Sequence, residues 1–286
     1  MRIALATSKD YPALTDDDQL LLQPLARRGI HAEPAVWSDP GCSWNSYNFV
    51  VIRSCWDYHL RIAEFRTWIE SLESAGVRVW NSPTVIRWNA DKDYLRELEA
   101  KGVPIVPTLW FERESQISLA HELRNAGWQQ AVIKPRISAT AHRTKLIRAE
   151  KAYDAQGFFD ELRAGPGVMV QKFMEAIVHQ GEWSLMFFDG KFSHAALKTP
   201  KSGDFRVQHD FGGKELPADP PKFLLDSAQK AINVVNDTLY ARVDGVVEDG
   251  QFYLMELELI EPALFLGSSP SAADRFADAI ALRATR

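Results

Sequence analysis

The chain has 286 residues, enough for about two domains at roughly 150 residues each. Its 33 Lys and Arg residues against 38 Asp and Glu residues give a net charge of −5, and 46% of the residues are hydrophobic and 25% charged. This composition is that of an ordinary globular protein and excludes a long disordered chain, a collagen-like chain and a coiled coil. The mild acidity argues against a dedicated nucleic-acid-binding protein, because such proteins usually carry a basic stripe.

Cysteine usage and apolar runs predict a cytoplasmic protein. Cys42 and Cys55 lack CxxC spacing, so we expect two reduced thiols. No apolar run approaches the about 20 residues of a membrane helix, and Lys9 and Asp10 interrupt the N-terminal apolar run that a signal peptide needs. We expect neither a membrane nor a nucleic acid as partner. The oligomeric state stays open, with a homodimer as one option.

The first third of the chain alternates between strand and helix patterns. Apolar runs predict four strands, at residues 3–6, 35–37, 49–52 and 77–80. Helical spacing lies between them, and Gly29 and Gly76 end the two helices. This alternation is typical of a mostly parallel sheet covered on both faces.

The rest of the chain combines helices with antiparallel hairpins. A helix is expected at 91–101, closed by Gly102, and Pro104 and Pro107 mark a linker before a small α+β unit at about 108–170. Asp-Gly dipeptides at 189–190 and 249–250 predict two hairpins. Amphipathic patterns predict two helices, at 223–240 and 272–282.

Three carboxylates gather on the second hairpin. Asp244 lies on its first strand, and Glu256 and Glu258 lie two residues apart on its second, so these two share one face. Oxygen ligands of this kind suit Mg²⁺, which usually takes one or two carboxylates together with phosphate oxygens. The alternative is a solvated polar face. The apolar neighbours argue against it, because unpaired buried carboxylates are costly.

The turn of this hairpin decides whether Asp244 joins that face. A two-residue loop at Asp249-Gly250 would place Val243 opposite Glu256. A three-residue loop with its glycine in the left-handed conformation shifts the register by one and places Asp244 there instead. We predict the bulged, three-residue turn, because clustered carboxylates need a cation.

Two lysines beside apolar segments are candidates for phosphate binding. Lys92 opens a helix, and Lys134 ends an apolar run where its charge can point at a phosphate. The following loop, 136–145, holds Ser138 and ends at Lys145, and its small residues let backbone N–H groups approach an anion. Each lysine alone also fits a solvated surface amine.

The segment Gln171-Lys172-Phe173 ends a strand and enters a polar turn. Free backbone groups at such a strand end can hydrogen-bond an adenine edge. Glu182, which follows the turn, can accept a hydrogen bond from a ribose hydroxyl. The alternative is an ordinary strand entering a loop.

Two further segments offer groups for a substrate. In a polar loop, Arg206 and Gln208 precede Gly212 and Gly213, and a guanidinium there can neutralise charge on a transferring group. The other segment follows the strand at 49–52, where ligands bind in open α/β sheets. In this segment Arg53 could bind a carboxylate, Asp57 could bind a cation, and Trp56 and Tyr58 offer aromatic rings. The candidate substrate residues are Arg53, Ser54, Trp56, Asp57 and Tyr58.

Taken in order, these pieces resemble the ATP-grasp superfamily over almost the whole chain. The resemblance rests on the order of Lys92, VIKP at 132–135, VQKF at 170–173, Gly181-Glu182, DFRVQ at 204–208, Gly212-Gly213, Asp244, and MELE at 255–258 with Pro262. Within the superfamily the chain is similar to the glutathione-synthetase-like branch. The segment at 51–58 and the strand at 193–195 resemble the cyclo-ligases that close the D-cycloserine ring from O-ureidoserine.

The resemblance implies an α/β and α+β chain with an ATP-grasp fold in three parts. These are an N-terminal Rossmann-like substrate subdomain at 1–88, a small lid subdomain at 89–172, and a larger C-terminal subdomain at 173–286 that carries the metal site. ATP would be held between two sheets.

The resemblance also implies residue roles. ATP would be bound by Lys92, Lys134, Ser138, Lys145, Gln171, Lys172, Phe173 and Glu182, and magnesium by Asp244, Glu256 and Glu258. The substrate would be bound by Arg53, Ser54, Trp56, Asp57, Tyr58, Arg206, Gln208, Gly212 and Gly213. Arg206 and Lys134 would act in catalysis, with Arg206 facing the γ-phosphate and the acyl phosphate.

Two departures from the family bear on these roles. Many relatives have Asn where this chain has Glu258, which adds charge to the metal site. Many relatives have a glycine-rich lid loop, whereas residues 136–145 contain no glycine. The second departure leaves open which backbone amides hold the phosphates.

The expected function is that of an ATP- and Mg²⁺-dependent carbon–nitrogen ligase. It would activate a carboxylate of an amino acid or small peptide as an acyl phosphate, which an amine-type nucleophile of a second molecule or of the same molecule then attacks. Three alternatives stay open: a phosphotransferase on the same scaffold, a non-catalytic nucleotide-binding regulator, and an α/β binding protein without ATP.

Overall fold

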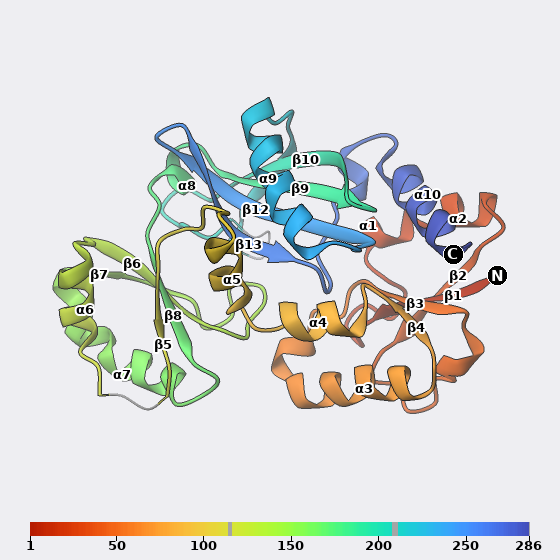
Figure 1. The fold of residues 1–286 in the computed structure, drawn as a ribbon, viewed down its shortest axis with the longest axis horizontal. Helices are drawn as coiled ribbons and strands as arrows, with labels where there is room; N and C mark the ends of the chain where they lie inside the picture. Colours follow the sequence, from red (N-terminus) through yellow and green to blue (C-terminus); the bar gives the residue numbers. More distant parts are fainter. Residues whose placement is uncertain (114–115, 208–210, 286) are drawn as a thin grey trace.

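The computed structural model describes residues 1–113, 116–207 and 211–285, and it contains three β-sheets with their helices (Figure 1). The first sheet has strand order β2-β1-β3-β4 and is parallel throughout. Its strands are β1 (Arg2–Thr7), β2 (His31–Val36), β3 (Phe49–Ile52) and β4 (Arg78–Trp80).

Alternate residues of these strands enter two hydrophobic clusters, so both faces of the first sheet are covered. One cluster joins Ile3, Leu5 and Val51 to α2 (Leu22–Arg27), which follows the short helix α1 (Asp16–Gln19), and to the C-terminal helix. The other joins Ala4 and Val50 to α3 (Ile62–Ser74) and α4 (Pro83–Asn89). The predicted parallel sheet is therefore confirmed.

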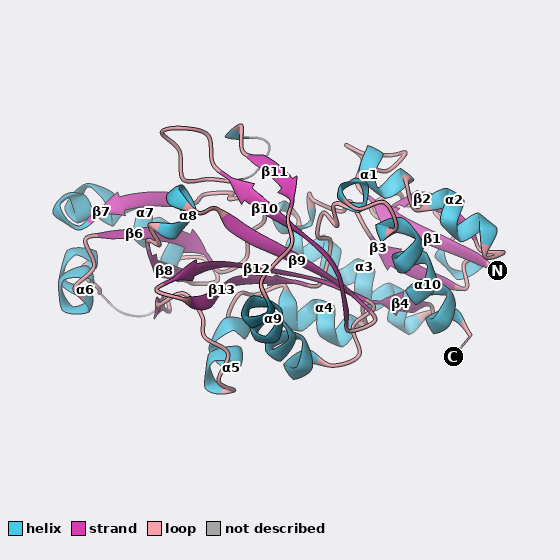
Figure 2. Ribbon diagram, turned by 90° about the horizontal axis from the view of Figure 1, so that it is seen from above, coloured by secondary structure: helices cyan, strands magenta, loops and turns pink. Residues whose placement is uncertain are grey.

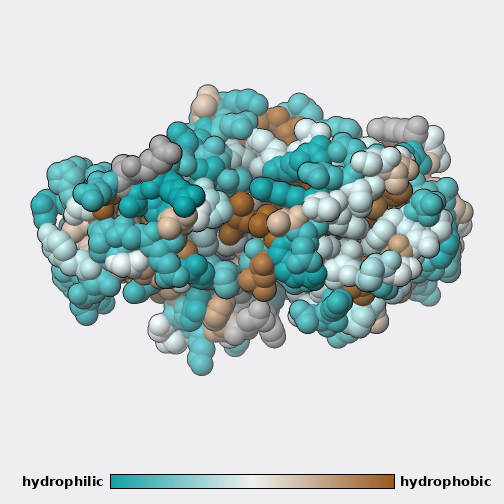
Figure 3. All heavy atoms as spheres, turned by 90° about the horizontal axis from the view of Figure 1, so that it is seen from below, coloured by the Kyte–Doolittle hydropathy of each residue, from teal (hydrophilic) through white to brown (hydrophobic). Residues whose placement is uncertain are grey.

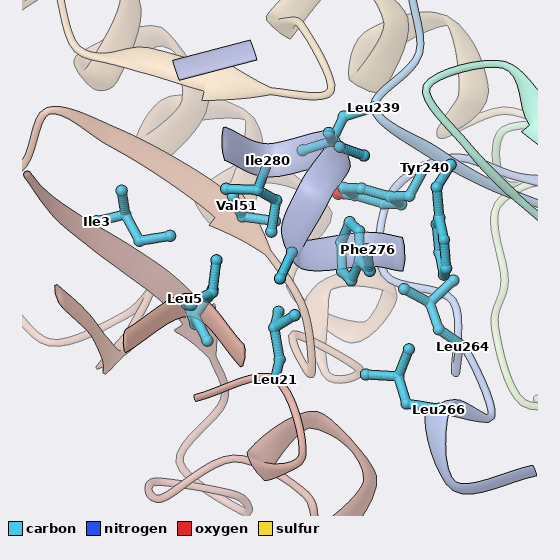
Figure 4. Close-up of a cluster of buried hydrophobic side chains, with 14 of the residues drawn as sticks. Ile3, Leu5, Leu21, Val51, Leu239, Tyr240, Leu264, Leu266, Phe276 and Ile280 are labelled. Carbon is cyan, nitrogen blue, oxygen red and sulfur yellow. The ribbon is translucent and has the colours of Figure 1, made fainter. Parts of the chain in front are cut away.

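The C-terminal helix α10 (Ala272–Ala284) packs against the first sheet (Figure 4). Phe276 and Ile280 are fully buried beside Leu5 and Val51. The Phe276 ring also stacks on Phe188 of the third sheet at a centroid distance of 4.6 Å. The end of the chain therefore joins the first sheet to the third.

The second sheet is antiparallel, with strand order β5-β8-β6-β7. Its strands are β5 (Thr108–Phe111), β6 (Gln130–Pro135), β7 (Lys145–Arg148) and β8 (Val168–Lys172). Helices α6 (Leu119–Ala126) and α7 (Ala152–Arg163) cover the face that carries Ala131 and Ile133. The intervening residues Val132 and Lys134 therefore point to the opposite face.

The third sheet is antiparallel, with strand order β11-β10-β9-β12-β13 (Figure 2). Its strands are β9 (Glu182–Phe188), β10 (Lys191–Thr199), β11 (Lys214–Pro217), β12 (Tyr240–Glu248) and β13 (Gln251–Glu258). Helices α5 (Tyr94–Ala100) and α9 (Lys222–Val235) share the hydrophobic cluster on one face, and the short α8 (Ala176–His179) precedes β9.

Some element boundaries differ from the prediction. The helix expected at 91–101 begins only at Tyr94, and α4, directly before it, was not predicted. The helix expected at 223–240 ends at Val235, because Asn236 and Asp237 take positive φ values of 53° and 49°, and β12 begins at Tyr240. Both hairpins form at their Asp-Gly dipeptides as predicted.

The predicted three-residue turn at Asp249-Gly250 is wrong, although the register it was meant to produce is present. Glu248 pairs directly with Gln251, so the loop has two residues, with φ values of 52° at Asp249 and 74° at Gly250. The register instead shifts within the strands, where Gly245 pairs with Leu254 but Asp244 pairs with Glu256. This β-bulge places Asp244 opposite Glu256.

In the parts of the chain that the structure describes, no helix is long and apolar enough to cross a membrane. Figure 3 shows one face of the molecule, on which apolar side chains gather near the middle and hydrophilic ones toward the ends.

Candidate active site

A cavity of about 780 Å³ opens between the second and third sheets and extends to the loops of the first. This volume lies within the range of roughly 300–1,000 Å³ that ligand sites span. Among the described residues that line the cavity, five carry cationic side chains, and they are Lys92, Lys134, Lys198, Arg206 and Arg242. Eight are carboxylic acids, and they are Asp16, Asp17, Glu182, Glu215, Asp244, Glu256, Glu258 and Glu261. Carboxyl groups thus outnumber cations in the cavity wall.

Lys134 enters the cavity from β6, two residues from Val132 on the same face. Burial lowers the pKa of Lys134, and the neighbouring charge of Glu256 opposes that effect. Among the cavity cations of the described chain, Lys134 is the one without an ion pair. An amine in this setting can accept an anionic ligand without first breaking a salt bridge.

Lys92 connects the cavity to the loop at 136–145. Its Nζ lies 3.0 Å from Glu256 Oε1 and donates a hydrogen bond to the Ser138 carbonyl. Its backbone N–H donates to the Arg136 carbonyl at 3.0 Å. The loop takes left-handed backbone conformations at Thr140, Ala141 and Arg143, although none is glycine.

The inner face of the third sheet carries a buried charge network. Cross-strand pairing places Lys198 beside Glu182, Asp244 beside Ser184 and Glu256, and Arg242 beside Glu258. Arg242 forms ion pairs with both Asp244 and Glu258, and Lys198 lies 3.4 Å from Asp244. Ser184 also donates to Asp244. Arg242 therefore bridges two of the three predicted metal ligands, Asp244 and Glu258.

Burial and these neighbours shift the carboxyl groups in opposite directions. Burial raises the pKa of Asp244, but Arg242 and Lys198 outweigh it and leave that pKa below its usual range. Burial raises the pKa of Glu258 well above its usual range even though Arg242 lowers it. Burial, followed by the charge of Glu256, raises the pKa of Glu261 to about 8.

The structure brings about half of the sequence-predicted residues into the cavity wall. They are Trp56, Tyr58, Lys92, Lys134, Ser138, Glu182, Arg206, Asp244, Glu256 and Glu258. Lys145, Gln171, Lys172, Phe173, Gly212 and Gly213 do not line it, nor do Arg53, Ser54 and Asp57. Gln208 lies outside the described residues.

Arg53, Ser54 and Asp57 lie behind the cavity wall. Arg53 is 1% exposed; its Nε donates to Asp18 Oδ1 at 2.9 Å and its Nη2 to the Pro262 carbonyl at 2.6 Å. Ser54 donates to the same Asp18 carboxylate, and Asp57 accepts from the Trp37 indole. The sequence predicts substrate contacts here, whereas the structure shows these side chains hydrogen-bonded to other parts of the protein.

The predicted adenine segment lies beside the cavity on β8. Gln171 pairs with the cavity residue Val132, so the two side chains share a face. Gln171 Oε1 is buried and has no hydrogen-bond partner in the described parts of the chain. The backbone N–H groups of Lys172 and Phe173 donate to the Pro107 and Gln130 carbonyls. The Gln171 amide is therefore the group that a ligand could still engage.

Sequence reasoning missed Arg242, Lys198 and Glu261. Arg242 could have been found, because it lies two residues before Asp244 and therefore on the same strand face. Lys198 pairs with Glu182 because the register shifts between Phe192 and His194, and this shift could not be predicted from the sequence. Glu261 follows the predicted MELE segment and has no motif of its own.

Comparison with known proteins identifies the relatives of this chain. Residues 3–81 match the family model described as "D-cycloserine synthetase DcsG, N-terminal domain". The cycloserine biosynthesis protein DcsG of Streptomyces lavendulae is 31% identical over 301 residues, covering 98% of each chain. The crystal structure of D-cycloserine synthetase DcsG superposes with a TM-score of 0.88 at 29% identity, covering 99% of this chain and 100% of that one.

A more distant sequence relative and a more distant solved structure also match. Glutathione synthetase of Prochlorococcus marinus strain MIT 9313 is 31% identical over 156 residues, covering 53% of this chain and 47% of that protein. The ATP-grasp ligase PsnB, in complex with its minimal precursor, Mg and ADP, has a TM-score of 0.66 at 17% identity, covering 99% of this chain and 98% of that one. The predicted ATP-grasp fold is confirmed.

Proposed function

This chain belongs to the family of the D-cycloserine synthetase DcsG, a family of ATP-grasp ligases, and on that premise we propose that it activates the carboxylate of a small amino-acid-like substrate with ATP in the cavity between its second and third sheets. A nitrogen of the same molecule then closes the ring, as the activity named for the relative suggests. The observation that carries the proposal is that Lys134, which has no ion pair among the described residues, lines the same cavity as the directly opposed carboxylates Asp244 and Glu256.

ATP fits the donors and acceptors of the cavity. The buried, unpartnered Gln171 Oε1 suits the amino group of adenine, and Glu182 suits a ribose hydroxyl. Lys134 and Lys92 suit the phosphates, because a lysine is a compact charge on a flexible stem. The relative PsnB was crystallised with Mg and ADP, which supports nucleotide binding to this fold. We place the reaction in the cytoplasm, where ATP is made.

Magnesium also fits, although no carboxylate set is assembled in advance. Within the described residues, no three or more His, Cys, Asp or Glu side chains converge to hold a metal by themselves. Mg²⁺ needs only one or two carboxylates when phosphate oxygens complete its shell, so Asp244, Glu256 and Glu258 would hold it together with ATP. A cavity rich in carboxyl groups cannot accept a polyphosphate without such cations. When bound, the metal would neutralise phosphate charge.

The chain's own residues account for the chemistry. An oxygen of the substrate carboxylate forms a bond to the γ-phosphorus as the bond to ADP breaks, which gives an acyl phosphate. The nitrogen nucleophile then bonds to the acyl carbon, loses its proton, and phosphate leaves. Lys134, Arg206 and Arg242 line the cavity and would stabilise the charge on the transferring group. The loop at 136–145 would exclude water from the intermediate.

Phosphate release dependent on Mg-ATP, measured in the presence of hydroxylamine, tests this proposal. The panel contains O-ureidoserine, D- and L-amino acids and γ-glutamylcysteine. We expect release together with a hydroxamate for one member, because only an acyl phosphate reacts with hydroxylamine in this way. Phosphate transfer without a hydroxamate would indicate a phosphotransferase instead. Nucleotide binding without any turnover would indicate a non-catalytic regulator.

A further inference from the structure

One end of the cavity is anionic and aromatic, unlike the phosphate end. Two segments wall this end, 11–58 from the first sheet and 261–265 from the residues after β13. Their lining side chains in the described chain include Asp16, Asp17 and Glu261 but no lysine or arginine. The two segments touch directly, since the Trp56 indole donates to the Glu261 carbonyl at 2.9 Å.

Glu261 is the buried acid of this end. The residue is 7% exposed, and in the part of the chain that the structure describes its carboxylate forms no ion pair and hydrogen-bonds only to its own backbone. Its charge is the one that most raises the pKa of the Cys55 thiol and of the Tyr58 hydroxyl after burial. The carboxylate therefore faces the segment at 55–58.

The neighbouring groups favour a small organic cation as the missing partner. Trp56 and Tyr58 line the cavity beside Glu261, and Tyr11 packs edge-on against Trp56 at 5.0 Å. Aromatic faces and a carboxylate together stabilise an ammonium group. Asp17 is less available for this role, because it accepts hydrogen bonds from the backbone N–H groups of Leu266 and Gly267, both at 2.9 Å.

We infer that Glu261 binds the ammonium group of an α-amino-acid substrate and so selects for a zwitterion. The charges of Glu256 and Lys92 both act on the pKa of Glu261, so the two ends of the cavity meet at this residue. An ammonium on Glu261 leaves the carboxylate of the same amino acid, one carbon away, at the phosphate end where activation occurs. The raised pKa of Glu261 agrees with a carboxyl group that lacks its cation. This inference names the residue that would hold the ammonium group of that substrate, and it rests on the proposed function.

Paired ligands test this assignment without requiring turnover. Each pair joins an amino acid to its deamino analogue: serine with 3-hydroxypropanoate, alanine with propanoate, and O-ureidoserine with 3-(ureidooxy)propanoate, each amino acid as both D and L forms. Binding is measured by calorimetry in the presence of Mg²⁺ and a non-hydrolysable ATP analogue. We expect at least one zwitterion to bind about tenfold or more tightly than its deamino partner, as the loss of a charged hydrogen bond implies.

The variant Glu261→Gln should reduce this preference to less than about threefold while its affinity for the ATP analogue stays within about threefold of the wild type. Asp10→Asn removes an equal charge from an exposed loop outside the cavity, and it should keep the preference. A wild type that prefers no zwitterion overturns the inference even if the variant fails to fold. So does a variant that keeps the preference. Loss of analogue binding in Glu261→Gln would instead assign Glu261 to the nucleotide end and also overturns it.

The failure of this inference is distinguishable from failure of the proposed function. A zwitterion preference that depends on Glu261, without any phosphate release, would support the ammonium site and remove the ligase proposal. Hydroxamate formation from deamino acids and amino acids alike would support the ligase proposal and remove the ammonium site.

Discussion

At the residue scale, the cavity separates charges that are already paired from those that are free. Arg242 and Lys198 are bound to the carboxylates around them, so they hold the sheet face in one arrangement. Lys134 has no such partner in the described chain, and burial lowers its pKa, so an anionic ligand beside it would stabilise its charge. A free cation of this kind is what a polyphosphate requires.

Replacing Lys134 with Met should therefore reduce activity far more than stability. We expect turnover to fall by about 10² to 10³, as observed when one electrostatic stabiliser is removed from an active site. The melting temperature should change little, because no salt bridge is lost. The matched control is Lys151→Met, because Lys151 is an exposed lysine between β7 and α7, outside the cavity wall. Equal turnover in the two variants would remove Lys134 from the phosphate site.

Replacing Arg53 with Met should reduce stability, unlike the replacement of Lys134. The sequence predicts a substrate contact, but the structure shows a buried guanidinium bonded to Asp18 and to the Pro262 carbonyl. Arg53→Met leaves Asp18 as an uncompensated buried charge and should cost about 3–5 kcal/mol of the free energy of unfolding. Urea denaturation measures this. A variant with unchanged stability but a raised KM would instead support the original substrate-binding role.

At the element scale, a β-bulge rather than a turn aligns the carboxylates. A Cβ atom on Gly245 would lie 2.4 Å from the Tyr253 carbonyl oxygen and from the Phe252 ring, so only glycine fits at the bulge. The sequence shows this glycine but not its role, because the Asp-Gly dipeptide nearby already explains a hairpin. That is why the register of Asp244 was predicted correctly and its cause was not.

Gly245→Ala should disrupt the bulge. We expect a loss of about 1–3 kcal/mol of the free energy of unfolding from overpacking, together with reduced turnover as Asp244 shifts relative to Glu256. Gly157→Ala in α7 is the control, because a Cβ there meets no atom within 4 Å and alanine favours a helix. Chemical denaturation and turnover of both variants check this prediction. A Gly245 variant as stable and active as the control would contradict the role of the bulge.

At the scale of the whole molecule, the order of elements could be predicted from the sequence, while the contacts between distant segments could not. Alternating apolar runs predicted the first sheet, and Asp-Gly dipeptides predicted both hairpins. The burial of Arg53 and the packing of α10 on the first sheet depend on residues more than two hundred positions away. Local patterns do not reveal such partners, so residues such as Trp56 and Lys134 were placed at the cavity from their strand ends, whereas the burial of Arg53 away from it was not foreseen.

The central claim is that ATP activates a substrate carboxylate in the cavity between the second and third sheets. The most direct test supplies the substrate found in the panel with ¹⁸O in its carboxylate and analyses the released phosphate by mass spectrometry. The account predicts one ¹⁸O atom in each phosphate, because the carboxylate oxygen that attacks the γ-phosphorus leaves with it. Phosphate without the label would contradict the account, since the phosphoryl group would then have passed to another acceptor.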